Sequence, residues 1–122
     1  MHALIVDDSS TVRGILKSFL VELGFEVTLA VDGRDALNRL SETGKTDLVL
    51  VDWNMPRMDG ISFVRAVRAR EDYAGLPLMM VTTNADLSQV SEALAAGADE
   101  YIMKPFTVDV IREKIELLGF RA

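Results

Sequence analysis

The chain has 122 residues, of which 49% are hydrophobic and 26% are charged, and it contains no cysteine. Its 13 basic and 19 acidic residues give a net charge of -6. This composition is typical of one globular domain with a single core; it excludes thiol chemistry and cysteine-ligated metal sites, and it argues against direct binding of nucleic acid.

The amino-terminal residues do not form a targeting segment. Met1 and His2 lead directly into the apolar residues Leu4 to Val6, without the basic stretch and long apolar region of a secretory signal. No apolar run approaches the length needed to span a membrane. We therefore expect a cytoplasmic protein that does not interact with membranes.

Short apolar runs rich in β-branched residues recur along the chain and predict five strands. The runs are Ala3–Val6, Glu26–Val31, Leu48–Val51, Pro77–Val81 and Glu100–Met103. Because most of them are continuously apolar, we expect a parallel sheet with both faces covered by helices.

Amphipathic segments alternate with these strands and predict five helices. The first ends at Gly24, the second runs from Gly33 to Leu40 after the N-cap Asp32, and the fifth follows the N-cap Thr107. The third and fourth are Ile61–Arg70, which should turn Arg65 and Arg68 to water, and Leu87–Ala96. The apolar positions expected to face the core are Val12, Ile15, Leu16, Phe19, Leu20 and Leu23 in the first helix; Phe63, Val64 and Val67 in the third; Leu87, Val90 and Leu94 in the fourth; and Val108, Ile111, Ile115 and Leu118 in the fifth.

Strict alternation of strands and helices predicts a single-domain α/β fold with a doubly wound sheet and right-handed crossovers. Ligands of such sheets bind beyond the carboxyl ends of the strands. These ends carry Asp7 and Asp8, Asp52, Thr82 and Lys104. Two like charges about 4 Å apart repel by roughly 4 kcal/mol at an effective dielectric of about 20, so carboxylates that converge here need cations.

The residue types at these ends indicate the chemistry. Oxygen ligands without histidine or cysteine favour a hard divalent ion such as Mg²⁺. Lys104 adds a second cation and Thr82 a hydroxyl donor, so the set is suited to a phosphoryl group. A single aspartate after a strand is more often a helix cap than a site residue, and we interpret Asp32 and Asp59 as caps. Polar or charged residues at four strand ends together favour a functional site.

Other polar and sulfur-containing residues have simpler interpretations. Ser9, Ser10 and Thr11 are expected to begin the first helix, and His2 has no evident partner. The methionines, including Met79, Met80 and Met103, are expected to fill the core.

Four motifs match a known family. They are Val6-Asp7-Asp8-Ser9-Ser10; Val51-Asp52-Trp53-Asn54-Met55-Pro56 with Met58-Asp59-Gly60; Met80-Val81-Thr82; and Tyr101-Ile102-Met103-Lys104-Pro105-Phe106. In these motifs, and from Leu4 to Leu118, the chain resembles response-regulator receiver domains, most closely the stand-alone CheY-like chemotaxis regulators. The resemblance implies a flavodoxin-like sheet of order 2-1-3-4-5, one receiver domain over residues 1–122 without an output domain, and a monomer.

The resemblance also implies residue roles. Asp52 would accept a phosphoryl group from a phosphohistidine of a sensor histidine kinase, or from acetyl phosphate. Mg²⁺ would be held by Asp7, Asp8, Asp52 and the backbone carbonyl of Asn54. Lys104 and Thr82 would bind the phosphoryl oxygens, and the Lys104–Pro105 bond would be cis.

A switch and a partner face follow from the same resemblance. Thr82 would move toward the phosphoryl group and Tyr101 would rotate inward. These movements would alter the surface around the fourth helix and the fifth strand. Only the phosphorylated protein would then bind its target there, such as a component of the flagellar motor switch. The expected partner-facing residues are Ala85, Val90, Leu94, Tyr101, Phe106 and Lys114. Asn84 replaces an acidic residue common in chemotaxis members, so Asn54 and Asn84 are expected to set the decay rate, and a phosphatase is a further candidate partner.

Three alternatives differ in their requirements. A Mg²⁺-dependent phosphohydrolase would need a second carboxylate two residues after Asp52, where Asn54 stands. A flavodoxin-like cofactor module would need a phosphate-binding loop in place of Asp7 and Asp8. A phosphorelay intermediate that passes the group to another histidine stays open beside the chemotaxis role.

Overall fold

Five parallel strands form one sheet in the computed structural model, which describes residues 1–55, 58–83 and 87–120. The strands are β1 (His2–Val6), β2 (Glu26–Ala30), β3 (Leu48–Asp52), β4 (Leu78–Thr82) and β5 (Glu100–Met103). Their order is β2-β1-β3-β4-β5, and every neighbouring pair is parallel. The predicted order is confirmed, and each predicted strand end lies within one residue of the observed one.

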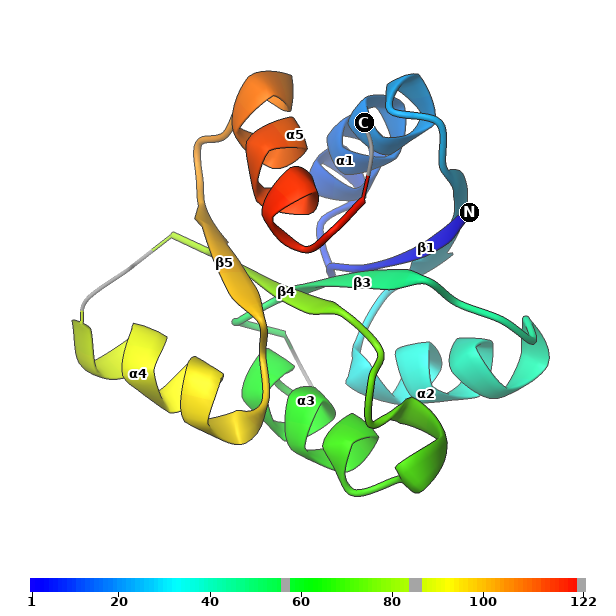
Figure 1. Cartoon of the computed structure of the whole chain (residues 1–122), viewed down its shortest axis with the longest axis vertical. Coiled ribbons are helices and arrows are strands. Elements are labelled where there is room, and N and C mark those ends of the chain that lie inside the picture. The colour runs from blue at the N-terminus through cyan, green and yellow to red at the C-terminus, as the bar shows by residue number, and fades with distance from the viewer. Residues whose placement is uncertain (56–57, 84–86, 121–122) are drawn as a thin grey trace.

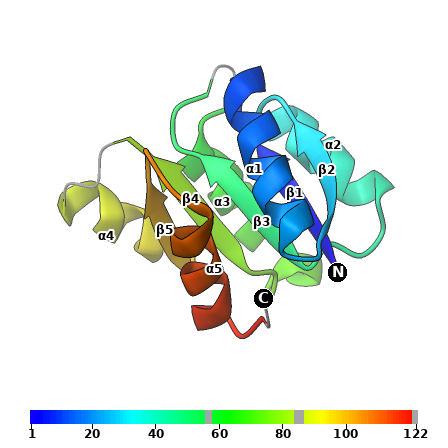
Figure 2. The ribbon, with the colours of Figure 1, turned by 90° about the horizontal axis from the view of Figure 1, so that it is seen from above.

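The helices lie on both faces of this sheet. They are α1 (Ser10–Glu22), α2 (Gly33–Glu42), α3 (Gly60–Arg68), α4 (Leu87–Ala96) and α5 (Val108–Leu117). α1 and α5 cover one face, and α2, α3 and α4 cover the other (Figures 1 and 2). A short 3₁₀ turn, η1 (Glu71–Tyr73), was not predicted. Within the described ranges, no helix combines the length and apolar character needed to cross a bilayer.

Side-chain caps explain where four of the helices begin. Ser9, Asp32, Asp59 and Thr107 each accept a hydrogen bond from the backbone amide three residues further on, at 3.3, 2.8, 2.9 and 3.3 Å. Each bond satisfies an amide that has no partner within its helix. The predicted caps and the predicted start of the first helix are therefore confirmed.

Alternate residues of each strand belong to two separate cores. In β1, Leu4 and Val6 face the cluster under α2, α3 and α4, whereas Ala3 and Ile5 face the cluster under α1 and α5. All four side chains are at most 1% exposed. The continuous apolar strands thus reflect a sheet that is buried on both faces, as expected.

Four residues predicted to be buried are exposed outside these cores. The accessible fraction of the surface is 57% for Met1, 43% for Ile15, 46% for Leu94 and 48% for Met103. Helical spacing identifies the inward side of a helix, but the adjoining strands set how wide the buried stripe is. In α4, Ala93 packs into the core and is only 2% exposed, so the buried stripe of this helix is narrow. The side chain of Leu87 lies outside the described part of the chain.

Two polar residues have partners that the sequence did not reveal. His2, expected to lack a partner, bonds through its ring to the hydroxyl of Thr28, and its backbone amide donates to Asp47 at 2.8 Å. Arg68, expected to face water, has a side chain that is only 17% exposed. The sequence could not reveal these contacts, because they are tertiary contacts with partners on other segments of the chain.

Arg68 connects α3 to the segment that follows α4. Its guanidinium donates to the carbonyls of Gly97 and Tyr73 at 2.9 and 2.7 Å and to Asp99 at 3.0 Å. The same Asp99 oxygen accepts from the amide of Leu78 at 2.9 Å. Gly97 has a φ of 121° and packs against the stem of Arg68, where a Cβ would collide. This position therefore requires glycine.

Replacing Arg68 should cost more stability than replacing its neighbour on the same helix. We expect Arg68→Ala to lower the free energy of unfolding by about 2–3 kcal/mol, because two part-buried backbone carbonyls and the carboxylate of Asp99 lose their donor. The control is Arg65→Ala, which removes a side chain that is 59% exposed and pairs with Glu92 at 3.6 Å. It should change stability by less than about 0.5 kcal/mol. Urea denaturation measures both, and equal losses would contradict this role of Arg68.

Candidate functional site

Strand register brings the predicted site residues to one edge of the sheet. Val6 pairs with Val51, so Asp7 and Asp52 follow neighbouring strands at the same level. Asp52 pairs with Val81, and Thr82 with Met103, which places Lys104 directly beyond the end of β5. The predicted convergence of strands 1, 3, 4 and 5 is thus observed.

Three carboxylates form a compact acidic cluster at this edge. Asp7, Asp8 and Asp52 each offer one carboxylate oxygen, and these oxygens all lie within 4.8 Å of one another. Asp7 and Asp52 are only 1% and 6% exposed, whereas Asp8 is exposed. Two of the three charges are therefore shielded from water, which strengthens the repulsion between them.

Backbone groups hold the carboxylates in place. Oδ1 of Asp7 accepts from the amide of Ser9 at 2.8 Å. The backbone carbonyl of Asp7 accepts from the guanidinium of Arg13 at 2.6 Å. The carboxylate of Asp52 accepts a hydrogen bond from the backbone amide of Asn54. These bonds fix both aspartates while leaving other lone pairs available to a ligand.

Lys104 is the cation that faces the cluster. Its Nζ lies 3.4 Å from an oxygen of Asp7 and 3.4 Å from an oxygen of Asp52, and its side chain is 19% exposed. The Lys104 amide donates to the carbonyl of Thr82 at 2.7 Å, which ties the loop after β5 to the end of β4. The Lys104–Pro105 bond is cis, as the resemblance predicted.

The surroundings of Asp52 disfavour its charged form. Burial, followed by the negative charge of Asp7, raises the pKa of Asp52 above its ordinary value. The charge and hydrogen bond of Lys104 and the amide of Asn54 act in the opposite direction without cancelling the effect. One lysine is thus insufficient for this cluster, and a further cation would stabilise it.

Gly60 has a role in the site that the sequence did not indicate. A Cβ at this position would collide with the backbone carbonyl oxygen of Asp52, and the Gly60 amide donates to the carbonyl of Trp53 at 3.0 Å. The first turn of α3 therefore packs directly on the end of β3. The sequence signal is the Asp59-Gly60 pair, which belongs to one of the family motifs. The sequence predicts Asp59 as a cap but predicts no packing role for Gly60.

The described residues of the predicted switch and partner face come from β4, β5, α4, α5 and the loop before α5. Thr82 is 4% exposed and lines a small space together with Tyr101 and Trp53. Val90 is partly buried and Leu94 exposed, whereas Phe106 packs edge-on against Phe19 of α1 at 6.1 Å between ring centroids. The nitrogen of Lys114 lies over the ring of Tyr101. Ala85 and Asn84 lie outside the described residues.

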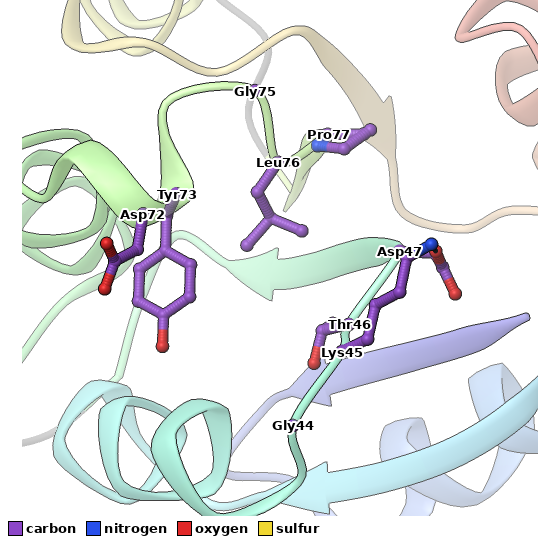
Figure 3. Close-up of a pocket in the computed structure, with 9 residues that line it drawn as sticks. All are labelled: Gly44, Lys45, Thr46, Asp47, Asp72, Tyr73, Gly75, Leu76 and Pro77. Carbon is purple, nitrogen blue, oxygen red and sulfur yellow. Dashed lines mark ion pairs between the residues drawn. The ribbon is translucent and has the colours of Figure 1, made fainter.

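A larger cavity lies at the opposite end of the strands. Its volume is about 370 Å³, and it is bordered by the loop residues 44–47 before β3 and by residues 72, 73 and 75–77 (Figure 3). Lys45 and Asp47 pair across 3.8 Å on its rim. None of the residues of the acidic cluster lines it, so the two sites are separate.

The fold is a doubly wound α/β domain whose carboxyl-end edge carries an acidic cluster that could hold a metal ion. The family model of the response regulator receiver domain matches residues 3–116, and the chain belongs to this family. It is 50% identical over 117 residues to the chemotaxis protein CheY of Pseudomonas aeruginosa, with 95% of this chain and 94% of that protein covered.

Solved structures give the same result. Vibrio cholerae chemotaxis protein CheY4 superposes with a TM-score of 0.90 at 34% identity, covering 96% of this chain and 97% of that chain. The receiver domain of sensor histidine kinase PA1611 from Pseudomonas aeruginosa gives 0.86 at 31% identity, covering 98% of both chains. That receiver domain was crystallised with a magnesium ion coordinated in its active site cleft.

Removing the charge of Asp52 should stabilise the protein in the absence of divalent metal. Since the pKa of Asp52 is raised in the fold, its contribution to stability is fully present below the pKa of the unfolded chain and is lost as pH rises through the folded value. We expect Asp52→Asn to raise the free energy of unfolding at pH 7 by about 0.5–2 kcal/mol, and this gain should shrink on acidification.

Chemical denaturation at pH 7 and at pH 4, both with a chelator, measures this difference. The matched control is Asp72→Asn, which removes a carboxylate that is 75% exposed and should change stability by less than about 0.5 kcal/mol. A gain for Asp52→Asn that is independent of pH would show that its ionisation is not responsible.

Proposed function

We propose that this chain is a response regulator of a two-component system, phosphorylated on Asp52 by a sensor histidine kinase, and that it signals in chemotaxis by binding a target protein when phosphorylated. The observation that carries the proposal is the buried carboxylate of Asp52, which lies beside the Asp7 and Asp8 carboxylates and 3.4 Å from the ammonium of Lys104. The similarity to chemotaxis proteins over nearly the whole chain supports it.

In the proposed reaction an oxygen of the Asp52 carboxylate attacks the phosphorus of the phosphohistidine. The new oxygen–phosphorus bond forms as the phosphorus–nitrogen bond breaks, and the electron pair of that bond leaves with the imidazole. Lys104 would pair with the phosphoryl oxygens, and the hydroxyl of Thr82 would donate to one of them. Such transfers depend on positioning and charge neutralisation more than on covalent chemistry from the protein.

The donor set fits Mg²⁺, which would be held by Asp7, Asp8, Asp52 and the backbone carbonyl of Asn54. Three convergent carboxylate oxygens without histidine or cysteine are the ligands of a hard cation. Burial and then the charge of Asp7 raise the pKa of Asp52, and a cation beside it would oppose both effects. When bound, the ion would supply positive charge that offsets the charge on the transferring group.

The output would be read on the face formed by α4, β5 and α5. Thr82 and Tyr101 would form the switch, and Ala85, Val90, Leu94, Phe106 and Lys114 would join Tyr101 in contacting the partner. The exposure of Leu94 supports this assignment, because an exposed leucine offers apolar surface on which a partner can dock. A component of the flagellar motor switch is the proposed target.

The proposal places the signalling unit in the receiver domain over residues 1–122, acting as a cytoplasmic monomer whose output is the binding of a target protein. Asn54 and Asn84 would set the rate of phosphoryl loss, alone or with a phosphatase. This role is regulatory, and self-catalysed gain and slow loss of the phosphoryl group would be the only chemistry.

Labelling with radioactive acetyl phosphate tests the proposal. We expect at most one phosphoryl group per chain, formed only with Mg²⁺, lost over time and absent in Asp52→Asn. The bond should have the alkaline lability of an acyl phosphate. Steady turnover of a phosphomonoester would instead favour a phosphohydrolase, and transfer of the label to a histidine protein would favour a relay intermediate. Labelling of Asp52→Asn equal to the parent would exclude Asp52 as the acceptor.

Metal binding should depend on Asp8 and be visible through the single tryptophan, which follows Asp52 in the chain. We expect Mg²⁺ to change the fluorescence of Trp53 and Asp8→Ala to weaken the apparent affinity about 10- to 100-fold, since one carboxylate ligand is lost. Asp72→Asn is the charge-matched control and should titrate like the parent. If both variants titrate like the parent, the metal binds elsewhere.

A further inference from the structure

Tyr101 and Lys114 meet at the edge of the sheet, although they belong to different layers. Tyr101 packs with the core cluster under α4, and β5 is the last strand of the sheet. Lys114 comes from α5, which covers the other face (Figure 1). Its Nζ lies 4.8 Å from the centroid of the Tyr101 ring, a distance that allows a cation–π interaction.

Glu100 fixes the position of this lysine. Its Oε1 accepts from Nζ of Lys114 at 3.0 Å and from the backbone amide of Tyr101 at 3.1 Å. The side chains of Lys114 and Glu100 are only 26% and 20% exposed. Because water screens this pair less than a surface pair, the ammonium is held over the ring and has little freedom to move away.

The ring lies beside a small space that it cannot enter in this arrangement. Tyr101, Thr82, Trp53 and Ala93 are among the residues that line the space, whose volume is about 10 Å³. That is room for about one water-sized probe and far less than an aromatic ring needs. Movement of Tyr101 toward Thr82 therefore requires both new space inside and loss of the contact with Lys114.

We propose that Glu100 and Lys114 are positioning residues that hold the Tyr101 ring at the edge of β5 and so set the resting balance of the phosphorylation switch. This inference rests on the proposed function, in which inward movement of Tyr101 accompanies phosphorylation. An interaction made in only one of two states shifts the equilibrium between them by its full free energy. By linkage, loss of the lysine contact should also strengthen binding of a phosphoryl analogue at Asp52.

Three substitutions separate charge from packing. Lys114→Met keeps the apolar stem and removes the cation, Lys114→Arg keeps a cation that can stack on the ring, and Glu100→Gln removes the charge that holds the lysine. Two readouts are used for each. Nuclear Overhauser contacts from the Tyr101 ring to the Thr82 methyl report ring position in the unphosphorylated protein. Titration with beryllofluoride in the presence of Mg²⁺, followed by Trp53 fluorescence, reports affinity at Asp52.

We expect Lys114→Met to increase the ring contact with Thr82 and to bind beryllofluoride about three- to ten-fold more tightly. Glu100→Gln should change both readouts in the same direction by a smaller factor, and Lys114→Arg should stay within about two-fold of the parent. The matched control is Asp109→Asn, which breaks an ion pair with Arg112 at 2.8 Å elsewhere on α5. It should leave both readouts unchanged.

The ring readout decides the inference without relying on phosphorylation. If neither Lys114→Met nor Glu100→Gln increases the contact between the Tyr101 ring and Thr82, the lysine does not hold the ring and the inference fails. If the ring moves but beryllofluoride affinity does not change, the inference also fails, because ring position is then not coupled to Asp52. If the parent does not bind beryllofluoride at all, the proposed function fails, and the ring readout still tests whether Lys114 holds Tyr101.

Discussion

The mutual repulsion of carboxylates at the end of a parallel sheet is the constraint on which the other features of this site depend. Parallel strands bring all their carboxyl ends to one edge, so Asp7 and Asp52 become neighbours through the register of β1 and β3. Their burial makes the repulsion costly, as the raised pKa of Asp52 shows. Lys104 offsets part of it, and the amides of Ser9 and Asn54 hold the carboxylates in an arrangement that favours a cation.

The proposed phosphoryl site and the proposed output face share the same two strands, β4 and β5. Thr82 ends β4, and its carbonyl accepts from the amide of Lys104 just beyond β5. Tyr101 lies on β5 only three residues before Lys104, with its ring against the core under α4. In the proposed function, a change in the bonding of Thr82 or Lys104 would reach this partly exposed aromatic ring through a few covalent and hydrogen bonds. Central β1 and β3, buried on both faces, provide the rigid part of the site.

The sequence predicted those features that depend on local pattern. Continuous apolar runs located the strands, and serine, threonine or aspartate before a helix located the caps, because both signals act over a few residues. Arg68 was misplaced because its partners Gly97 and Asp99 lie 29 and 31 residues away, and spacing within a helix carries no information about them. Gly60 was underestimated for a similar reason, since its need for a missing Cβ arises from the carbonyl of Asp52 in another element.

Anchoring by Arg68 also restricts how α4 can change its orientation. The segment after this helix is tied down by Arg68 at Gly97 and by the amide of Asp99, which donates to Leu78 at 2.8 Å. A reorientation of α4 is then a tilt about its carboxyl-terminal end. The helix has 10 residues, which corresponds to a length of about 15 Å. A tilt of about 10° would move the far end by roughly 2–3 Å while the anchored end stays in place. The displacement of the helix would therefore be greatest at its amino-terminal end, which follows β4 and the acidic edge.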